Sequence, residues 1–186
     1  EDNKVYLTPY YFAELEVAEC VNEIIAGEKE IKWDNNKVLM RFCKNKNYAL
    51  EAKQKLAVIE FTKSTGGFYI LNGSAGCGKT FSLKIILSIL EEMYQENFNR
   101  EMDVLLMAPT GKASKVAGKA TEIPCVTVHR GLGYNPVVGY EFNDENQFEA
   151  DVVIIDESSM LDIMLTRSLL KAIQKRGTKV IFLGDT

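Results

Sequence analysis

The chain has 186 residues, of which 46% are hydrophobic and 26% charged. This length can bury one sizeable core and is short for two full domains. The formal net charge of -4 argues against binding nucleic acid through bulk electrostatics alone, although the distribution of charge matters more than its sum. No run of about 18 apolar residues and no basic, apolar leader is present, so the sequence predicts a soluble protein without a membrane partner.

The four cysteines lie far apart, form no C-x-x-C pair and are accompanied by a single histidine. Such a set predicts reduced thiols rather than a metal site. We therefore expect a cytoplasmic protein. The four positions are Cys20, Cys43, Cys77 and Cys125.

The N-terminal quarter has the pattern of a helix followed by a connector. Apolar residues recur at helical spacing over residues 10–26, after Pro9 and before Gly27. Residues 28–47 are polar, with a weak strand-like patch at 38–42, and are interpreted as a linker or small appendage. A second helix is predicted over residues 49–61. We expect an N-terminal helix and linker over 1–47 and a core domain over 48–186.

From residue 68 onward, short apolar strands alternate with longer helical stretches. The strands are FYILN, VLLMAP, VVIID and KVIFLG, and helices are predicted to start at Lys79, Gly111 and Met160. Continuous apolar runs are typical of strands covered on both faces. The pattern predicts an α/β fold with a mostly parallel sheet and helices on both faces. Residues 132–150 contain Gly, Pro, Asn and acids and are predicted to form a solvated hairpin or loop.

The segment GSAGCGKT matches the phosphate-binding pattern G-x-x-x-x-G-K-[ST] between a predicted strand and a predicted helix. The glycines let backbone N–H groups turn toward phosphates, and the helix N-terminus adds partial positive charge. Lys79 would reach the β and γ phosphates, and the Thr80 hydroxyl would bind Mg²⁺. The residues predicted to hold ATP here are Gly73, Ser74, Ala75, Gly76, Cys77, Gly78, Lys79, Thr80 and Phe81.

The segment VVIIDESS is an apolar strand that ends in two adjacent carboxylates, at the edge of the sheet where α/β proteins bind ligands. Asp156 is suited to holding Mg²⁺ together with Thr80, and Glu157 to orienting and deprotonating the attacking water. Alternatively, Asp156 or Ser158 only caps the following helix.

Five segments occur in the order and approximate spacing of superfamily 1 DNA helicases: GSAGCGKT, APTGKAS, TVHR, IIDESSM and the terminal LGDT. Together with the N-terminal VYLTPYYFAELEVAECVNEI, they resemble the RecD-like branch, the exodeoxyribonuclease V alpha subunit family. The resemblance implies a first RecA-like motor domain that stops at motif III. It also implies an ATP-dependent helicase moving 5′ to 3′, with single-stranded DNA, a second RecA-like domain and other recombination and repair proteins as partners.

The resemblance also implies roles for individual residues. Gln54 matches a glutamine that reads adenine, or is an exposed helical glutamine. Asp185 matches the γ-phosphate-sensing end of motif III and is counted with Lys79, Asp156 and Glu157 as catalytic. Motifs Ia and Ib imply DNA contacts from Thr110, Lys112, Ser114, Thr127 and His129, where His129 alternatively serves packing and the lysines alternatively form a solvated helix face.

Two other functions stay open at this point. A P-loop phosphotransferase would need an acceptor pocket and a lid with arginines, and residues 132–150 supply no arginine. A nucleotide-binding module without hydrolysis would lack the carboxylate that Glu157 provides. Because a helicase binds ATP between two motor domains, we expect this chain to bind nucleotide but to hydrolyse it slowly.

Overall fold

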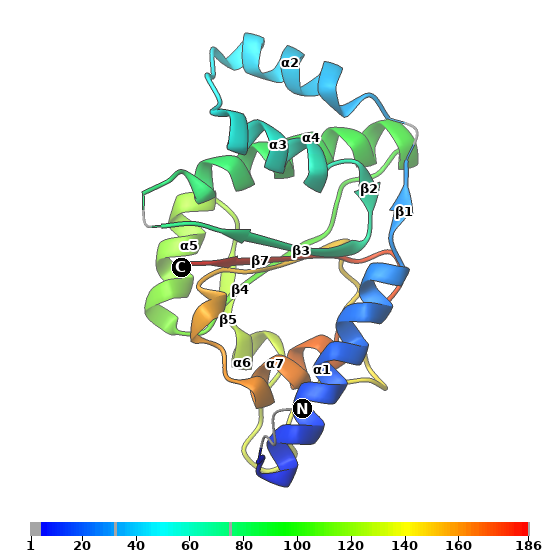
Figure 1. The fold of residues 1–186 in the computed structure, drawn as a ribbon, viewed down its shortest axis with the longest axis vertical. Coiled ribbons are helices and arrows are strands. Elements are labelled where there is room, and N and C mark those ends of the chain that lie inside the picture. Colours follow the sequence, from blue (N-terminus) through cyan, green and yellow to red (C-terminus); the bar gives the residue numbers. More distant parts are fainter. Residues whose placement is uncertain (1–4, 32, 75, 186) are drawn as a thin grey trace.

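The computed structural model describes residues 5–31, 33–74 and 76–185, and its centre is a five-stranded parallel sheet (Figure 1). The strand order is β3-β7-β6-β4-β5, and every neighbouring pair runs parallel. The predicted α/β fold is thereby confirmed. The strands are β3 (Gly67–Asn72), β4 (Val104–Ala108), β5 (Cys125–Thr127), β6 (Val152–Ile155) and β7 (Lys179–Gly184).

Helices cover both faces of this sheet, as Figure 1 shows. One face carries α2, α3 and α4, and the other carries α1 and α7. A short antiparallel pair, β1 (Lys29–Glu30) with β2 (Ser64–Thr65), lies beside the main sheet. The helices are α1 (Thr8–Ala26), α2 (Asn35–Lys46), α3 (Ala52–Phe61), α4 (Lys79–Phe98), α5 (Gly111–Thr121), α6 (Val128–Gly131) and α7 (Ile163–Lys171).

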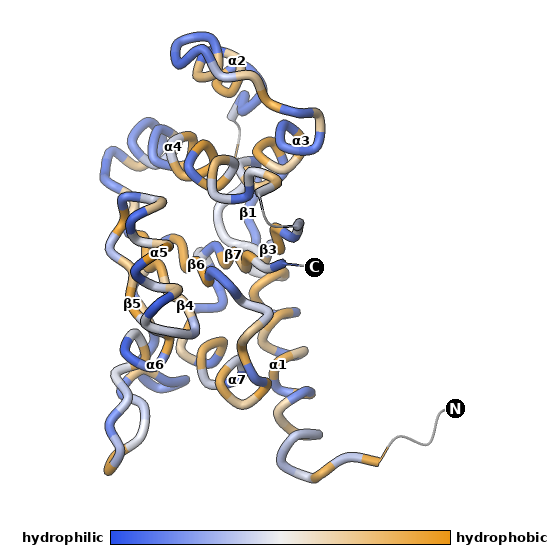
Figure 2. The backbone as a smooth tube through the Cα atoms, turned by 90° about the vertical axis from the view of Figure 1, so that its left-hand side faces the viewer, coloured by the Kyte–Doolittle hydropathy of each residue, from blue (hydrophilic) through white to orange (hydrophobic). Residues whose placement is uncertain are grey.

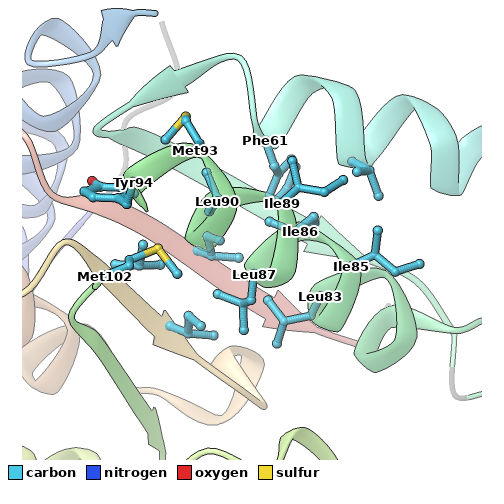
Figure 3. Close-up of a cluster of buried hydrophobic side chains, with 14 of the residues drawn as sticks. Phe61, Leu83, Ile85, Ile86, Leu87, Ile89, Leu90, Met93, Tyr94 and Met102 are labelled. Carbon is cyan, nitrogen blue, oxygen red and sulfur yellow. The ribbon is translucent and has the colours of Figure 1, made fainter. Parts of the chain in front are cut away.

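The continuous apolar runs of the central strands supply two separate buried clusters. In β6, Val152 and Ile154 join the cluster under α4, whereas Val153 and Ile155 join the cluster under α1 and α7. Successive side chains of a strand point to opposite faces, so one strand serves both. Figure 3 shows the first cluster, with Leu83, Leu87 and Leu90 of α4 lying over the strands.

The N-terminal helix α1 confirms the helix predicted over residues 10–26. Pro9 lies in its first turn, a position at which the missing N–H costs nothing. Ala13, Cys20 and Ile24 are buried, and Cys20 and Ile24 belong to the cluster beneath α7. An N-terminal segment thus contributes side chains to the core beneath the parallel sheet.

The strand-like patch predicted at residues 38–42 was wrong, because these residues lie inside α2. Asp34 caps this helix, its carboxylate accepting a hydrogen bond of 3.0 Å from the backbone N–H of Lys37. Val38 and Leu39 are buried against α3 and α4. A short apolar run cannot distinguish a strand from a buried helix face, and packing against α4 decides it here.

The helix expected to start at Met160 was also wrong. Residues Ser158–Met160 form one 3-10 turn, and α7 begins at Ile163, after Asp162, whose carboxylate accepts a 2.8 Å hydrogen bond from Leu165 N–H. The predicted hairpin within 132–150 is present as a bridge between Asn135 and Gly139.

The ends of the 132–150 segment are not solvated, in contrast to the prediction. Leu132 and Phe148 are buried in the cluster beneath α7, where they anchor the segment to the sheet. β5 and α6 were not predicted as elements. Within the described residues, no helix is both long enough and apolar enough to cross a membrane.

Candidate functional site

The loop between β3 and α4 has the backbone shape that phosphate binding requires. Gly76 and Gly78 have φ values of 79° and 87°, a left-handed conformation that L side chains rarely adopt. A Cβ at Gly78 would lie 2.5 Å from Nε2 of Gln54, so this position also lacks space for a side chain. Ala75, predicted to belong to this loop, lies outside the described residues.

Gly73 connects the loop to the neighbouring strand. Its N–H donates to the carbonyl oxygen of Gly184 at the end of β7, 3.4 Å away. A Cβ at Gly73 would lie 2.6 Å from Sγ of Cys77, so the exposed Cys77 covers it closely. Cys77 N–H in turn donates to the Ser74 carbonyl at 3.2 Å.

Lys79, the first residue of α4, is held by oxygen atoms of the loop and of β7. Its Nζ donates to the Gly73 carbonyl at 2.6 Å, to the Ser74 carbonyl at 3.2 Å and to the carboxylate of Asp185. The hydrogen bond that Lys79 donates to Asp185 raises the pKa of Lys79, so the ammonium stays charged. The structure therefore brings together Lys79 of α4 and Asp185 at the end of β7.

Gln54 of α3 lies across the loop from Lys79. Its Nε2 donates to the Cys77 carbonyl at 3.3 Å, and its Oε1 accepts from the backbone N–H of Glu51 at 3.1 Å. A cleft of about 600 Å³ opens between α3 and the loop, with Gln54, Ala57 and Lys79 in its wall. The volume lies within the range of small-molecule sites. An adenine base bound by the Gln54 amide would take the place of the Cys77 carbonyl as the acceptor for Nε2.

The two residues after Lys79 face different surroundings. Thr80 is exposed, so its hydroxyl is accessible beside the loop. Phe81 is partly buried, and its ring meets that of Tyr48 edge-on at a centroid distance of 5.0 Å. The structure thus places Phe81 in the packing of α4 against the segment before α3.

Asp156 and Glu157 follow β6, at the carboxyl edge of the sheet. Burial raises the pKa of Asp156 above its ordinary value, although the N–H of Glu157 donates to its Oδ1 at 3.0 Å and Lys79 favours its charged form. Glu157 has a φ of 53°, a left-handed conformation that costs of order 1 kcal/mol in a residue other than glycine. Such strain is typical of positions where function fixes the backbone.

The donor set fits Mg²⁺ better than a metal held by protein ligands alone. Within the described ranges, no group of three or more His, Cys, Asp or Glu residues is placed to hold an ion. Mg²⁺ usually keeps several waters and takes one or two carboxylates plus substrate phosphates. The half-buried Asp156 accepts one hydrogen bond among the described residues, which leaves carboxylate oxygen for such a water shell.

The threonines of the two predicted DNA-contact motifs lie at the ends of neighbouring strands. Ala108 of β4 pairs with Thr127 of β5, and Thr110 follows β4. Each threonine caps a helix, the Thr110 hydroxyl accepting from Ala113 N–H at 3.2 Å and the Thr127 hydroxyl accepting from Arg130 N–H at 3.3 Å. A hydroxyl that accepts in this way still has its own hydrogen to donate.

Lys112 and Ser114, both predicted to contact DNA, are placed differently. Lys112 is exposed in the first turn of α5. Ser114 is buried, and its hydroxyl donates to the Gly111 carbonyl at 3.1 Å within the same helix. The structure therefore directs Lys112, and not Ser114, toward the surface.

His129 is exposed and lies among aromatic rings that the sequence motifs did not mark. The ring of Tyr134 meets it at a centroid distance of 5.7 Å and that of Tyr140 at 6.3 Å, and the two tyrosines are 5.3 Å apart. Tyr134 and Tyr140 come from the hairpin within 132–150. The sequence of this hairpin carried no motif, so only the fold brings these rings to His129.

Two of the DNA-contact candidates share one depression with two of the catalytic candidates. A hollow of about 340 Å³ lies between α5 and the turn after β6, and its walls include Thr110, Lys112, Asp156, Glu157 and Met160. The parallel strand order causes this meeting, because β4 and β6 are neighbours and their carboxyl ends share an edge.

A glycine-rich loop from the first strand of a parallel sheet to a helix, with a lysine and a neighbouring acidic strand end facing it, is typical of P-loop ATPase domains of RecA-like fold. A family model described as an AAA domain matches residues 54–186. The chain belongs to this family, and its relatives place it in the RecD-like branch of superfamily 1 helicases. Nucleotide binding follows from that membership.

Two curated relatives illustrate the match. The ATP-dependent RecD2 DNA helicase of Deinococcus radiodurans is 37% identical over 117 residues, covering 63% of this chain and 15% of that protein. The RecBCD enzyme subunit RecD of Haemophilus influenzae is 32% identical over 154 residues, covering 71% of this chain and 23% of that protein. The chain thus spans less than a quarter of either relative's length.

A solved structure of Pif1 helicases at forked double-stranded DNA also aligns with the fold. Its TM-score is 0.46 at 24% identity, covering 74% of this chain and 34% of that chain.

Proposed function

We propose that this chain is the ATP-binding first motor domain of an ATP-dependent DNA helicase. One observation carries the proposal: the hollow that Thr110 and Lys112 share with Asp156 and Glu157, next to the loop that holds Lys79. A motor must connect nucleotide state with grip on a strand, and this shared wall provides the shortest connection. The proposal includes a cytoplasmic location, a second RecA-like domain, 5′ to 3′ movement and assembly with other recombination and repair proteins.

In this proposal the loop backbone and Lys79 bind the β and γ phosphates of ATP. Thr80 and Asp156 hold Mg²⁺, which neutralises charge that develops on the transferring phosphoryl group. Glu157 orients the attacking water and takes its proton, and Asp185 senses the γ-phosphate through Lys79. Gln54 reads the adenine edge after releasing the Cys77 carbonyl.

Thr110, Lys112 and Thr127 are proposed to contact the phosphate backbone of single-stranded DNA. Their hydroxyl and ammonium groups donate hydrogen bonds that fix the strand without reading its sequence. His129, with Tyr134 and Tyr140 beside it, faces the same strand. Ser114 supports this surface from inside α5, where its hydroxyl is already bonded.

The test is a titration of fluorescein-labelled oligo-dT with the 186-residue chain, with and without a non-hydrolysable ATP analogue and Mg²⁺. A motor domain is expected to change its affinity for the strand severalfold when the analogue binds. Lys79→Ala should abolish that change while leaving the affinity without analogue intact. A Glu157→Gln variant, which preserves shape and removes the base, should keep the change.

Other outcomes identify the alternatives. Analogue binding without any strand binding, together with phosphoryl transfer to a small acceptor, would indicate a phosphotransferase. Strand affinity that is equal with and without bound analogue would contradict the motor proposal and favour a binding module.

A further inference from the structure

The segment over residues 35–55, which comprises α2 and the start of α3, concentrates positive charge in an acidic chain. It contains six basic residues and one acid, whereas the rest of the chain contains 16 basic and 25 acidic residues. All six basic side chains are exposed. The α2 part of this basic segment lines neither the nucleotide cleft nor the hollow beside α5, whereas Lys53 and Gln54 of α3 do line the cleft. The basic residues are Lys37, Arg41, Lys44, Lys46, Lys53 and Lys55.

Three of these residues form a stripe along one face of α2. Lys37, Arg41 and Lys44 have the spacing i, i+4 and i+7, which places them on one side of a helix over about 10 Å. The opposite side carries the buried Val38 and Leu39. Figure 2 shows α2 at the outer end of the molecule, with hydrophilic and hydrophobic residues along its turns.

Within the described part of the chain, most of these charges lack a counter-ion. Arg41 forms an ion pair with Glu92 of α4. Among the residues that the structure describes, the five lysines of the segment form no ion pair. Burial raises the pKa of Cys43 in α2, and the nearby charge of Lys55 in α3 partly offsets this rise. The positive field therefore extends from α2 to α3.

Helix stability does not account for the stripe. Lys44 and Lys46 lie in the last turn of α2, where a cation is favoured by the helix dipole. Lys37 lies in the first turn, where the same dipole repels a cation. A protein with excess acid also has no need of this cluster for solubility. An anionic partner explains all of the positions.

We propose that the stripe Lys37, Arg41 and Lys44 on α2 is a docking surface for the phosphate backbone of duplex DNA. Duplex DNA carries a dense row of phosphates along its axis, and exposed cations such as Lys37, Arg41 and Lys44 can contact that row without reading the base sequence. Single strands are bound by cationic grooves with aromatic rings on which bases stack. The rings of His129, Tyr134 and Tyr140 lie beside α6, whereas the rings of the basic segment, Phe42 and Tyr48, pack against each other, and Tyr48 also packs against Phe81 of α4. The two kinds of nucleic acid thus have separate surfaces.

The proposal goes beyond the motor function and rests on it in one respect, namely that the chain works on DNA. The duplex would be held by α2 on one side while the strand passes α5 and α6. Because the contact involves phosphates, it is independent of sequence and of ATP.

The test compares the 186-residue chain with Lys37→Gln/Lys44→Gln, which leaves the Arg41–Glu92 pair intact. The probes are a blunt 20-base-pair duplex and oligo-dT, measured by fluorescence anisotropy from low to moderate salt. The variant is expected to bind the duplex about tenfold more weakly, and the slope of log K against log salt should fall by about 2. Binding to oligo-dT should change less than twofold. Unaltered circular dichroism and melting would show that α2 is still folded, since Gln is a good helix former.

A matched control removes the same charge from another helix. Lys115→Gln/Lys119→Gln on α5 should weaken oligo-dT binding and leave duplex binding unchanged. Equal loss of duplex binding in both variants would show a general charge effect and overturn the proposal. Unchanged duplex binding in the α2 variant would also overturn it. The same conclusion would follow if the wild-type chain bound phosphatidylserine vesicles or its own copies but did not bind the duplex. Failure of ATP to alter oligo-dT binding, by contrast, counts against the motor function and not against this surface.

Discussion

Lys79 shows how a single residue can connect nucleotide binding with the end of β7. Its ammonium donates to two carbonyls of the loop and to Asp185, so a triphosphate that attracts Lys79 competes with a carboxylate. Asp185→Asn removes the competing charge. In EDTA, the variant is expected to bind a fluorescent ATP analogue about threefold to fivefold more tightly, since exposed pairs are worth up to about 1 kcal/mol. AMP, which lacks the distal phosphates, should bind with unchanged affinity.

Fluorescence titration with each nucleotide measures this change, and Lys79→Ala is the control that abolishes the triphosphate preference in either background. Weaker ATP binding by Asp185→Asn in EDTA would show that the carboxylate assists binding instead of competing for Lys79.

Cys77 offers a second prediction at the scale of one residue. It is exposed in the loop. The other three thiols are less accessible, and burial raises the pKa of Cys20 and Cys43 and raises that of Cys125 to about 11. Thiolates are the reactive form, so one equivalent of N-ethylmaleimide should modify Cys77 first. The adduct would fill the space beside Gly73 and weaken ATP binding at least tenfold. ATP added beforehand should protect the thiol.

The measurement is the dissociation constant before and after modification, with the site confirmed by mass spectrometry. Cys77→Ala should bind ATP and resist the reagent. Unchanged ATP affinity after complete modification of Cys77 would contradict the prediction.

At the scale of secondary-structure elements, Lys179 at the start of β7 makes stability depend on pH. This lysine is 1% exposed, donates to the Gly66 carbonyl at 3.0 Å and lies over the ring of Tyr69. Burial lowers its pKa from 10.5 to about 7. Burial would raise the pKa of Glu28, but hydrogen bonds from Ser64 and Tyr69 outweigh it, so the nearby carboxylate stays ionised.

Between about pH 7 and pH 10, the unfolded chain binds a proton on Lys179 that the folded chain has released, so this group increases the free energy of unfolding as pH rises. Lys179→Met removes that contribution. The stability of the wild type relative to the variant should therefore increase with pH over this window, by at most about 1.4 kcal/mol per unit. Urea unfolding at pH 6, 8 and 9.5 measures it, with the exposed Lys119→Met as control. A constant difference would show that Lys179 keeps its ordinary pKa.

At the scale of the whole molecule, α1 determines whether the N-terminal segment folds together with the sheet. We propose residues 1–47 as a helix and linker preceding the ATPase domain, yet Ile24 is fully buried beneath α7. Glu16 of α1 also accepts hydrogen bonds from Arg167 of α7 at 2.7 and 2.9 Å. Ile24→Ala is therefore expected to lower the free energy of unfolding by about 2 to 5 kcal/mol in one cooperative transition.

Leu15→Ala is the matched control, because Leu15 lies on the same helix and is 44% exposed. Its effect should stay within about 0.5 kcal/mol. A separate early transition in the Ile24→Ala variant, with the main transition unmoved, would show that α1 unfolds independently of the sheet.

The sequence alone predicted the elements that depend on local pattern. The glycine spacing before Lys79 predicted the loop, because glycine adopts the left-handed backbone of Gly76 and Gly78 without strain. Continuous apolar runs predicted parallel strands with two covered faces, as β6 confirms. The start of α7 and the helical state of residues 38–42 were not predictable in this way, because a capping Asp162 and contacts with α4 decide them.

Tertiary structure alone decided which distant groups meet. Lys79 contacts Asp185 because β3 and β7 are neighbours, and Thr110 shares a wall with Glu157 because β4 and β6 are neighbours. Strand order depends on long-range packing that leaves no local trace in the sequence. The same holds for the rings around His129 and for the basic stripe of α2, whose composition was visible but whose exposed, helical face was not. The sequence by itself thus determined the phosphate loop and the acidic strand end, and the fold decided what surrounds them.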